Sequence, residues 1–130
     1  KKLVNIFVQR YFCLVNKGMK ILYSKHFPPG SFGAINLFGV IIARKGYGKL
    51  TDAEINHEYI HTRQMVEMLV IFFYISYLIE WIFRLIQYRN MFDAYVNISY
   101  EREAYRNMYN IEYLKKRRPF TFKNYYKKTV

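Results

Sequence analysis

Cysteine, histidine and acidic residues are all scarce in this chain of 130 residues. Each shortage limits the kinds of site or partner that the chain can have. The single cysteine, Cys13, excludes an intramolecular disulfide framework and a zinc cluster held by thiolates. It allows a reducing compartment, so a cytoplasmic location stays open. Only 9 Asp and Glu stand against 21 Lys and Arg, and the formal net charge is +12. Such a charge attracts anionic partners: phospholipid surfaces, nucleic acid or acidic proteins.

A long apolar run is also missing. Residues 68–79 carry no Lys, Arg or Asp and are strongly apolar, but Glu80 and Arg84 soon interrupt the pattern, and a membrane-spanning helix needs about 20 apolar residues. We expect a buried helix here, with a helix lying in a membrane interface as the alternative. A peripheral membrane location therefore stays open. Glu80 and Arg84 are four residues apart, which predicts a structural ion pair on the helix.

Glycine and proline are absent from residues 49–118, so most of this region is predicted to be helical. Thr51 followed three residues later by Glu54 fits a capping box at its start. One unbroken helix of that length is not expected in a small domain. We predict a break near residues 88–90 and a further helix over residues 93–114.

The region before this helix is where a strand is expected. Residues 26–33 are rich in turn-forming Pro and Gly. Residues 34–44 are rich in Ile and Val and predict one strand bent at Gly39, with a short hairpin as the alternative. The chain is thus predicted to form a single α+β, helix-dominated domain over residues 1–130. Its basic, aromatic tail from about residue 115 is expected to be mainly a solvated charge cluster.

Two of the three histidines fall in one motif, H-E-x-x-H, at His57-Glu58-Tyr59-Ile60-His61. Positions i and i+4 share a helix face, so His57 and His61 can direct two imidazoles to one point. Two neutral imidazoles suit zinc. Glu58 is placed to act as general base on a water molecule beside the metal. The competing interpretation is two packed or solvent-facing histidines and a surface carboxylate.

A catalytic zinc usually has three protein ligands, and two downstream carboxylates are candidates for the third. Glu101 and Glu103 are two residues apart, so on a helix they point in different directions and only one can face the metal. Spacing alone leaves both open. Cys13 is far upstream and His26 lies in the Pro-rich loop, so both are poorer candidates.

The motif together with the downstream segment EREA resembles the H-E-x-x-H and E-x-x-A pattern of the gluzincin metallopeptidases. The resemblance is closest to the membrane-associated peptidases of the CAAX-processing and heat-shock type. The strings NHEYIHTRQ, YLIEW and ISYEREAYRN also resemble a compact bacterial family of zincin-like proteins, over roughly residues 28–118. The resemblance implies a zincin-like fold with an active-site helix beneath a small sheet. It also implies Glu101 as the third ligand, with Glu103 as the alternative, and Ala104 as a small residue that permits close helix packing.

One position departs from the gluzincin pattern. Where many gluzincins have an Asp four residues after the ligand Glu, this chain has Tyr105. We expect the Tyr105 hydroxyl or Gln64, three residues after His61, to orient a ligand imidazole. Tyr105, Tyr95 and Tyr100 are also candidates for stabilising an oxyanion.

The sequence therefore predicts a zinc-dependent metallopeptidase that hydrolyses a peptide or protein substrate. His57, His61 and Glu101 would hold the metal, and Glu58 would act as the base. An extended substrate would add to an edge strand within residues 34–44, although an ordinary core strand is an equal alternative. The alternative function is a non-catalytic module that binds an anionic membrane surface or a partner protein, with a structural metal or none. Nucleic-acid binding is disfavoured because no recognised motif accompanies the tail.

Overall fold

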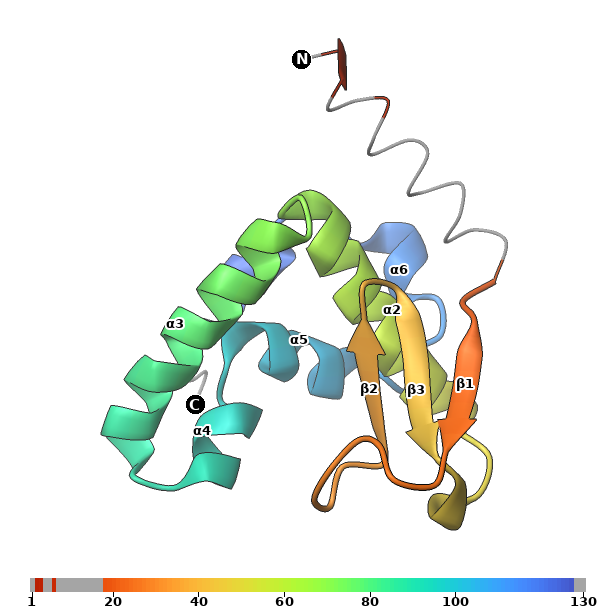
Figure 1. The fold of residues 1–130 in the computed structure, drawn as a ribbon. Helices are drawn as coiled ribbons and strands as arrows, with labels where there is room; N and C mark the ends of the chain where they lie inside the picture. The colour runs from red at the N-terminus through yellow and green to blue at the C-terminus, as the bar shows by residue number, and fades with distance from the viewer. Residues whose placement is uncertain (1, 4–5, 7–17, 128–130) are drawn as a thin grey trace.

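A small sheet and a set of helices make up the protein in the computed structural model, which describes residues 2–3, 6 and 18–127 (Figure 1). Cys13 lies outside the described residues. The strands are β1 (Ile21–Ser24), β2 (Ala34–Leu37) and β3 (Val40–Arg44). The helices are α2 (Asp52–Glu67), α3 (Ile71–Tyr88), α4 (Met91–Val96), α5 (Ser99–Asn107) and α6 (Tyr113–Lys116), with 3₁₀ helices η1 (Lys45–Tyr47) and η2 (Thr121–Tyr125). The predicted α+β, helix-dominated class is confirmed.

Residues 34–44 form a hairpin and not a single bent strand. β2 and β3 are antiparallel, with Leu37 opposite Val40. The two residues between them, Phe38 and Gly39, have φ values of 53° and 88°, as in the two-residue turns that match the twist of a hairpin. β1, which the sequence analysis did not predict, pairs in parallel with β3, giving the order β1-β3-β2. β2 is therefore at an edge of this sheet.

Helix α2 begins at the predicted capping box. Glu54 N donates to Thr51 Oγ1 at 3.3 Å, and Thr51 N donates to Glu54 Oε2 at 2.7 Å. The helix ends at a break that the sequence analysis missed, where Leu69 and Val70 have φ values of 53° and 62°. A left-handed conformation at a non-glycine residue costs roughly 1–2 kcal/mol. Burial of the Val70 side chain in the core helps to offset that cost.

The predicted break near residues 88–90 is confirmed. Arg89 has a φ of 53° and ends α3, with its N–H donating to Leu85 O at 2.8 Å. Asn90 then caps α4, since its Oδ1 accepts from Asp93 N at 3.0 Å. Both devices are local, which explains why the sequence predicts this break.

The single helix predicted over residues 93–114 is wrong, because α4, α5 and α6 replace it. A long-range contact accounts for the start of α5. The Glu80 carboxylate accepts from the backbone N and the hydroxyl of Ser99, at 2.8 and 2.6 Å. The same carboxylate makes the predicted ion pair with Arg84, at 3.3 Å. Glu80 is therefore structural, as predicted, and it also caps α5.

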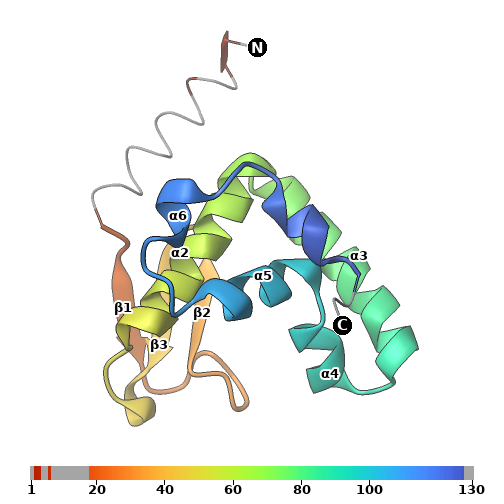
Figure 2. The same ribbon diagram turned by 180° about the vertical axis from the view of Figure 1, so that it is seen from behind.

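Helices α2 and α3 form the two arms of a V, bent by 111°. The sheet lies against α2, and α5 crosses between the two arms in both views (Figures 1 and 2). The core fills the angle of the V with buried side chains of α2, α3, α5 and η2 and of the residues directly before α3 and α5: Met65, Val70, Phe73, Ile98, Tyr100 and Phe122. This packing brings α5 alongside the helix that carries the H-E-x-x-H motif.

The prediction of a buried helix over residues 68–79 is wrong for one face of α3. Within α3 only Phe73 and Glu80 are buried, and its outward side chains are apolar and exposed. None of the described helices is by itself long and apolar enough to cross a membrane. The bent pair of α2 and α3 passes that test together, on length and composition only.

The tail from about residue 115 packs against the core. Phe122 in η2 is buried in the core cluster. The side chain of Arg117 is buried and forms ion pairs with Glu67 and Glu103. The expectation of a solvated charge cluster is therefore wrong for Arg117, although its neighbours are exposed: Lys115, Lys116 and Arg118.

Candidate metal centre

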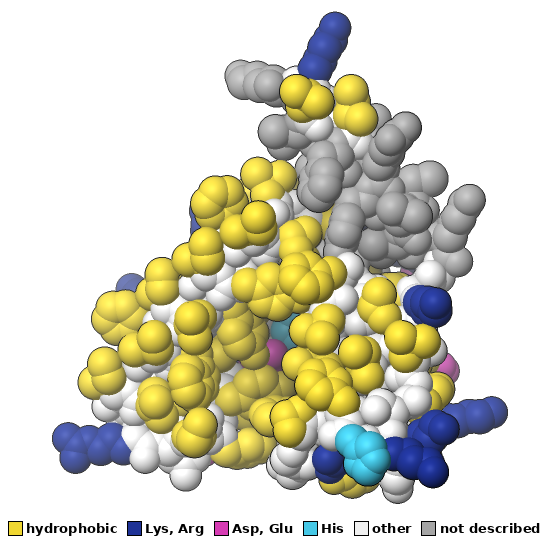
Figure 3. Space-filling view, in the orientation of Figure 1, with side chains coloured by type: hydrophobic (Ala, Val, Ile, Leu, Met, Phe, Trp, Pro, Cys, Tyr) yellow, Lys and Arg dark blue, Asp and Glu magenta, His cyan; other side chains and the backbone are white. Residues whose placement is uncertain are grey.

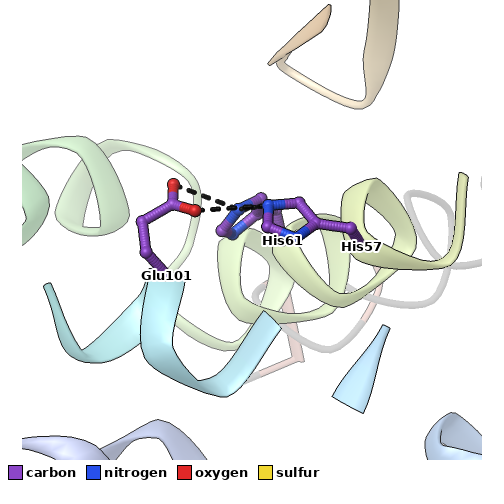
Figure 4. A group of neighbouring side chains, drawn as sticks. All are labelled: His57, His61 and Glu101. Atoms are coloured by element: carbon purple, nitrogen blue, oxygen red, sulfur yellow. Dashed lines mark hydrogen bonds and ion pairs between the residues drawn. The ribbon is translucent and has the colours of Figure 1, made fainter. Parts of the chain in front are cut away.

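His57, His61 and Glu101, which we call the HHE group, meet at one buried point (Figure 4). Nε2 of His57 lies 3.2 Å from Oε2 of Glu101, and Nε2 of His61 lies 3.2 Å from Oε1. The two Nε2 atoms are 3.0 Å apart, and one ligand atom from each residue lies within 4.8 Å of the others. The three residues are only 6, 5 and 3% exposed, in the same order. The structure therefore brings the predicted ligand set together.

Of the two candidate carboxylates, Glu101 reaches the imidazoles and Glu103 does not. Glu103 is fully buried, and its carboxylate accepts from the Tyr113 hydroxyl at 2.8 Å and from the Arg117 guanidinium. It forms an ion pair with Arg117, a residue of the tail that is distant in sequence. Ala104 is also fully buried on α5, as the expected close helix packing requires. Glu103 is structural in this arrangement.

Gln64 contacts His61 as predicted. Its Oε1 lies 2.8 Å from His61 Nδ1, while its Nε2 donates to the Tyr100 carbonyl at 3.1 Å and to Glu103 Oε2 at 2.9 Å. The two acceptors fix the orientation of the amide, so the Nδ1 of His61 must carry the hydrogen. The Nε2 of His61 is then the atom that faces Glu101, and it is the one available to a metal.

The hydroxyl groups of Tyr95, Tyr100 and Tyr105 bond to other hydroxyl groups. The Tyr105 hydroxyl bonds to that of Tyr95, at 3.2 Å, and not to an imidazole. Instead, the ring of Tyr105 packs edge-on against His57, with centroids 4.5 Å apart. The predicted orienting hydrogen bond from Tyr105 is therefore replaced by a ring contact. The Tyr100 hydroxyl bonds to Ser76 at 2.6 Å, so Tyr100 serves packing.

Two contacts of the site were missed by the sequence analysis. The Tyr77 hydroxyl, on α3, donates to Glu101 Oε1 at 2.8 Å. Nothing in the apolar run around Tyr77 signals that role. Asn36 of β2 donates from Nδ2 to the Glu58 carbonyl at 2.9 Å and to Thr62 Oγ1 at 2.7 Å. A single Asn within an Ile- and Val-rich segment was the available signal.

The electrostatics of the site follow from burial and close opposite charges. Burial raises the pKa of the Glu58 carboxyl, and the nearby imidazoles of His61 and His57 offset only part of that rise. Burial lowers the pKa of His61, but the Glu101 carboxylate outweighs it and the pKa is about 9. Burial likewise acts to raise the pKa of Glu101, but the two imidazoles hold it far below its usual range. The two shifts favour a protonated His61 imidazole beside an ionised Glu101 carboxylate.

Two buried polar atoms of the HHE group, His57 Nδ1 and Glu101 Oε2, have no hydrogen-bond partner among the described residues. Buried polar atoms are nearly always hydrogen-bonded. Here the carboxylate oxygen without a partner points at the imidazole nitrogens. Two imidazole nitrogens and a carboxylate oxygen at this spacing form a donor set that suits a divalent transition metal, and zinc is one of these. The residues present therefore fit the predicted metal.

A hollow between α3 and the β2–β3 hairpin gives access to the site. Figure 3 shows histidine and acidic atoms at its floor, beneath hydrophobic side chains. His26 is exposed, so the buried histidines of the described residues are those of the HHE group. A separate pocket of about 500 Å³ does not include the HHE group and adjoins it through Tyr105; its lining is Phe92, Val96, Arg102, Tyr105, Arg106, Tyr125 and Lys127. The HHE group does not line that pocket, so we take the hollow in Figure 3 as the route to the HHE group.

Comparison with known proteins finds no relative: no family model, no curated protein and no solved structure matches this chain.

Proposed function

We propose that this protein is a zinc-dependent hydrolase that cleaves peptide bonds, of the gluzincin type that its motifs resemble. The observation that supports it most is the convergence of His57, His61 and Glu101 at one buried point, with Glu58 next to the first of them. Three protein ligands leave a position for water, which is the arrangement of catalytic zinc sites. Structural zinc sites usually have four protein ligands, and the described group has three. That difference favours the catalytic proposal over the non-catalytic alternative.

The proposed mechanism assigns each residue a separate task. A zinc ion bound by the HHE group would polarise the substrate carbonyl and lower the pKa of a water molecule. The Glu58 carboxylate, made more basic by burial, takes a proton from that water and passes it to the leaving amine. Gln64 orients His61, and Tyr77 holds Glu101.

The position of β2 supports an extended peptide as the substrate. Arg44 N donates to the Gly33 carbonyl at 2.8 Å, so in this antiparallel ladder the backbone groups of Ala34 and Asn36 face away from β3. None of the described strands pairs with β2 on that side. The Asn36 carbonyl accepts there from the Tyr74 hydroxyl, at 3.3 Å. The rest of this edge is suited to pairing with a substrate strand.

The metal itself gives the first test. Purified protein supplied with zinc is expected to bind one zinc ion per chain, measured by elemental analysis. His57→Ala and Glu101→Ala should lose it, because each removes a ligand atom. Glu112→Gln is the matched control and should keep it, because Glu112 is exposed and lies outside the HHE group. Absence of zinc from the parent protein after zinc is added back would exclude the proposal.

Metal binding is also expected to depend on pH. With a pKa of about 9, His61 is protonated at neutral pH in the metal-free protein. The metal must displace that proton, so affinity should rise about tenfold per pH unit between pH 6 and 8. Calorimetry in buffers of different ionisation enthalpy should detect close to one proton released per zinc at pH 7. A zinc affinity that is constant over this range would contradict the coupling of His61 to Glu101.

A further inference from the structure

The outward side of α3 carries an unbroken stripe of apolar side chains. Their positions recur every three or four residues, as one face of an α-helix requires. Each is between 46 and 70% exposed; the stripe, which we call the apolar face, consists of Ile71, Phe72, Ile75, Leu78, Ile79, Ile82, Phe83 and Ile86. Scattered apolar residues are normal at a protein surface, but a contiguous patch of this size marks an interaction site.

The apolar face does not stop at the end of α3. Met91 and Phe92, which begin α4, are also exposed, and so is Phe38 at the tip of the β2–β3 hairpin. Figure 3 shows hydrophobic side chains spread over α3 and the hairpin, whereas the Lys and Arg side chains visible in this view lie at the margins. An apolar centre with a basic margin suits an amphipathic surface that lies on a membrane.

The charges of the chain favour a lipid surface over a second copy of the protein. The formal net charge is +12, so two copies that met at this face would repel one another. Among the described residues, exposed acidic side chains are few: Asp52, Glu54, Asp93 and Glu112. Anionic headgroups attract exposed Lys and Arg side chains near a bilayer surface. One such residue, Arg89, is exposed directly after the last residue of α3.

We infer that the apolar face of α3 binds the surface of an anionic lipid bilayer, with the helix lying in the plane of the interface. The helix has 18 residues and is about 27 Å long, and its apolar side chains would enter the boundary between headgroups and acyl chains. The face belongs to one helix flanked by exposed apolar residues, and the opposite side of that helix packs on the core. This inference does not depend on the proposed hydrolase activity or on metal binding.

Co-sedimentation with vesicles tests the inference. The parent protein is expected to bind vesicles of phosphatidylcholine with phosphatidylserine, and to bind vesicles of phosphatidylcholine alone more weakly. High salt should weaken binding to the anionic vesicles. The double variant Ile79→Glu with Phe83→Glu should bind them at least about tenfold more weakly, because it places two charges in the apolar face. Ile111→Glu, which changes an exposed Ile in the turn before α6, is the matched control and should bind like the parent.

Three results would overturn the inference. The first is a parent protein that stays entirely in the supernatant with anionic vesicles. The second is a double variant that binds as tightly as the parent, which would assign binding to another part of the chain. A stable dimer in light scattering that the double variant dissociates would assign the face to a second copy. All substituted side chains are exposed, so circular dichroism is expected to show the same fold in each variant.

Discussion

Replacing Glu58 with Gln is expected to lower peptide hydrolysis roughly 10²- to 10⁴-fold while leaving the zinc in place. The amide has nearly the same shape but cannot accept the proton from water. Zinc should remain because Glu58 is not part of the HHE group. Burial raises the pKa of the Glu58 carboxyl, so its ionised form disfavours the folded state above that pKa. The variant should therefore be at least as stable as the parent at pH 8.

The measurement is kcat/KM on a fluorescence-quenched peptide library, made beside zinc content and thermal unfolding of the same samples. Glu112→Gln is the matched control, because Glu112 is exposed and outside the site. Activity that survives in Glu58→Gln with zinc bound would remove Glu58 from its proposed role. Loss of both zinc and stability would mean that Glu58 supports the structure of the site.

The local part of the site could be predicted from the sequence. His57 and His61 needed only the helical repeat, and Gln64 needed one further turn of the same helix. The choice between Glu101 and Glu103 could not be made from spacing alone. Spacing shows that the two side chains point in different directions on a helix, and it does not show which one faces the imidazoles. What separates them is the distant Arg117, which binds Glu103 and leaves Glu101 to the imidazoles. Contacts of this kind depend on how α5 and the tail pack, and no local pattern reports them.

The features of the fold that depend on neighbouring residues were also predicted, and those that depend on distant packing were not. The capping box at Thr51 and the break at residues 88–90 depend on neighbouring residues, and both were predicted. The break at Leu69 and Val70 has no Gly, Pro or capping side chain to mark it. It exists because burial of Val70 and its neighbours in the core holds an unfavourable backbone. The apolar composition of α3 predicted burial, and it could not show that one face stays exposed.

Replacing Arg117 with Met is expected to lower the free energy of unfolding by about 3–5 kcal/mol. The Arg117 side chain is 1% exposed and lies between the carboxylates of Glu67 on α2 and Glu103 on α5. Burial acts to lower the pKa of Arg117, but its hydrogen bonds to Glu103 and Glu67 outweigh this and raise it. Met fills a similar volume and leaves both carboxylates without their cation. Urea unfolding of the metal-free proteins measures the loss.

Two further variants make this prediction specific. Arg118→Met removes the adjacent, exposed guanidinium and should change the free energy of unfolding by no more than about 0.5 kcal/mol. Arg117→Lys should fall between the two, because an ammonium cannot bind both carboxylates in the manner of a guanidinium. A loss below about 1 kcal/mol in Arg117→Met would show that the buried ion pairs do not hold α2 and α5 together. A large loss would show that Arg117 ties the tail to α2 and α5, and Glu103 also accepts a hydrogen bond from the Gln64 that contacts His61.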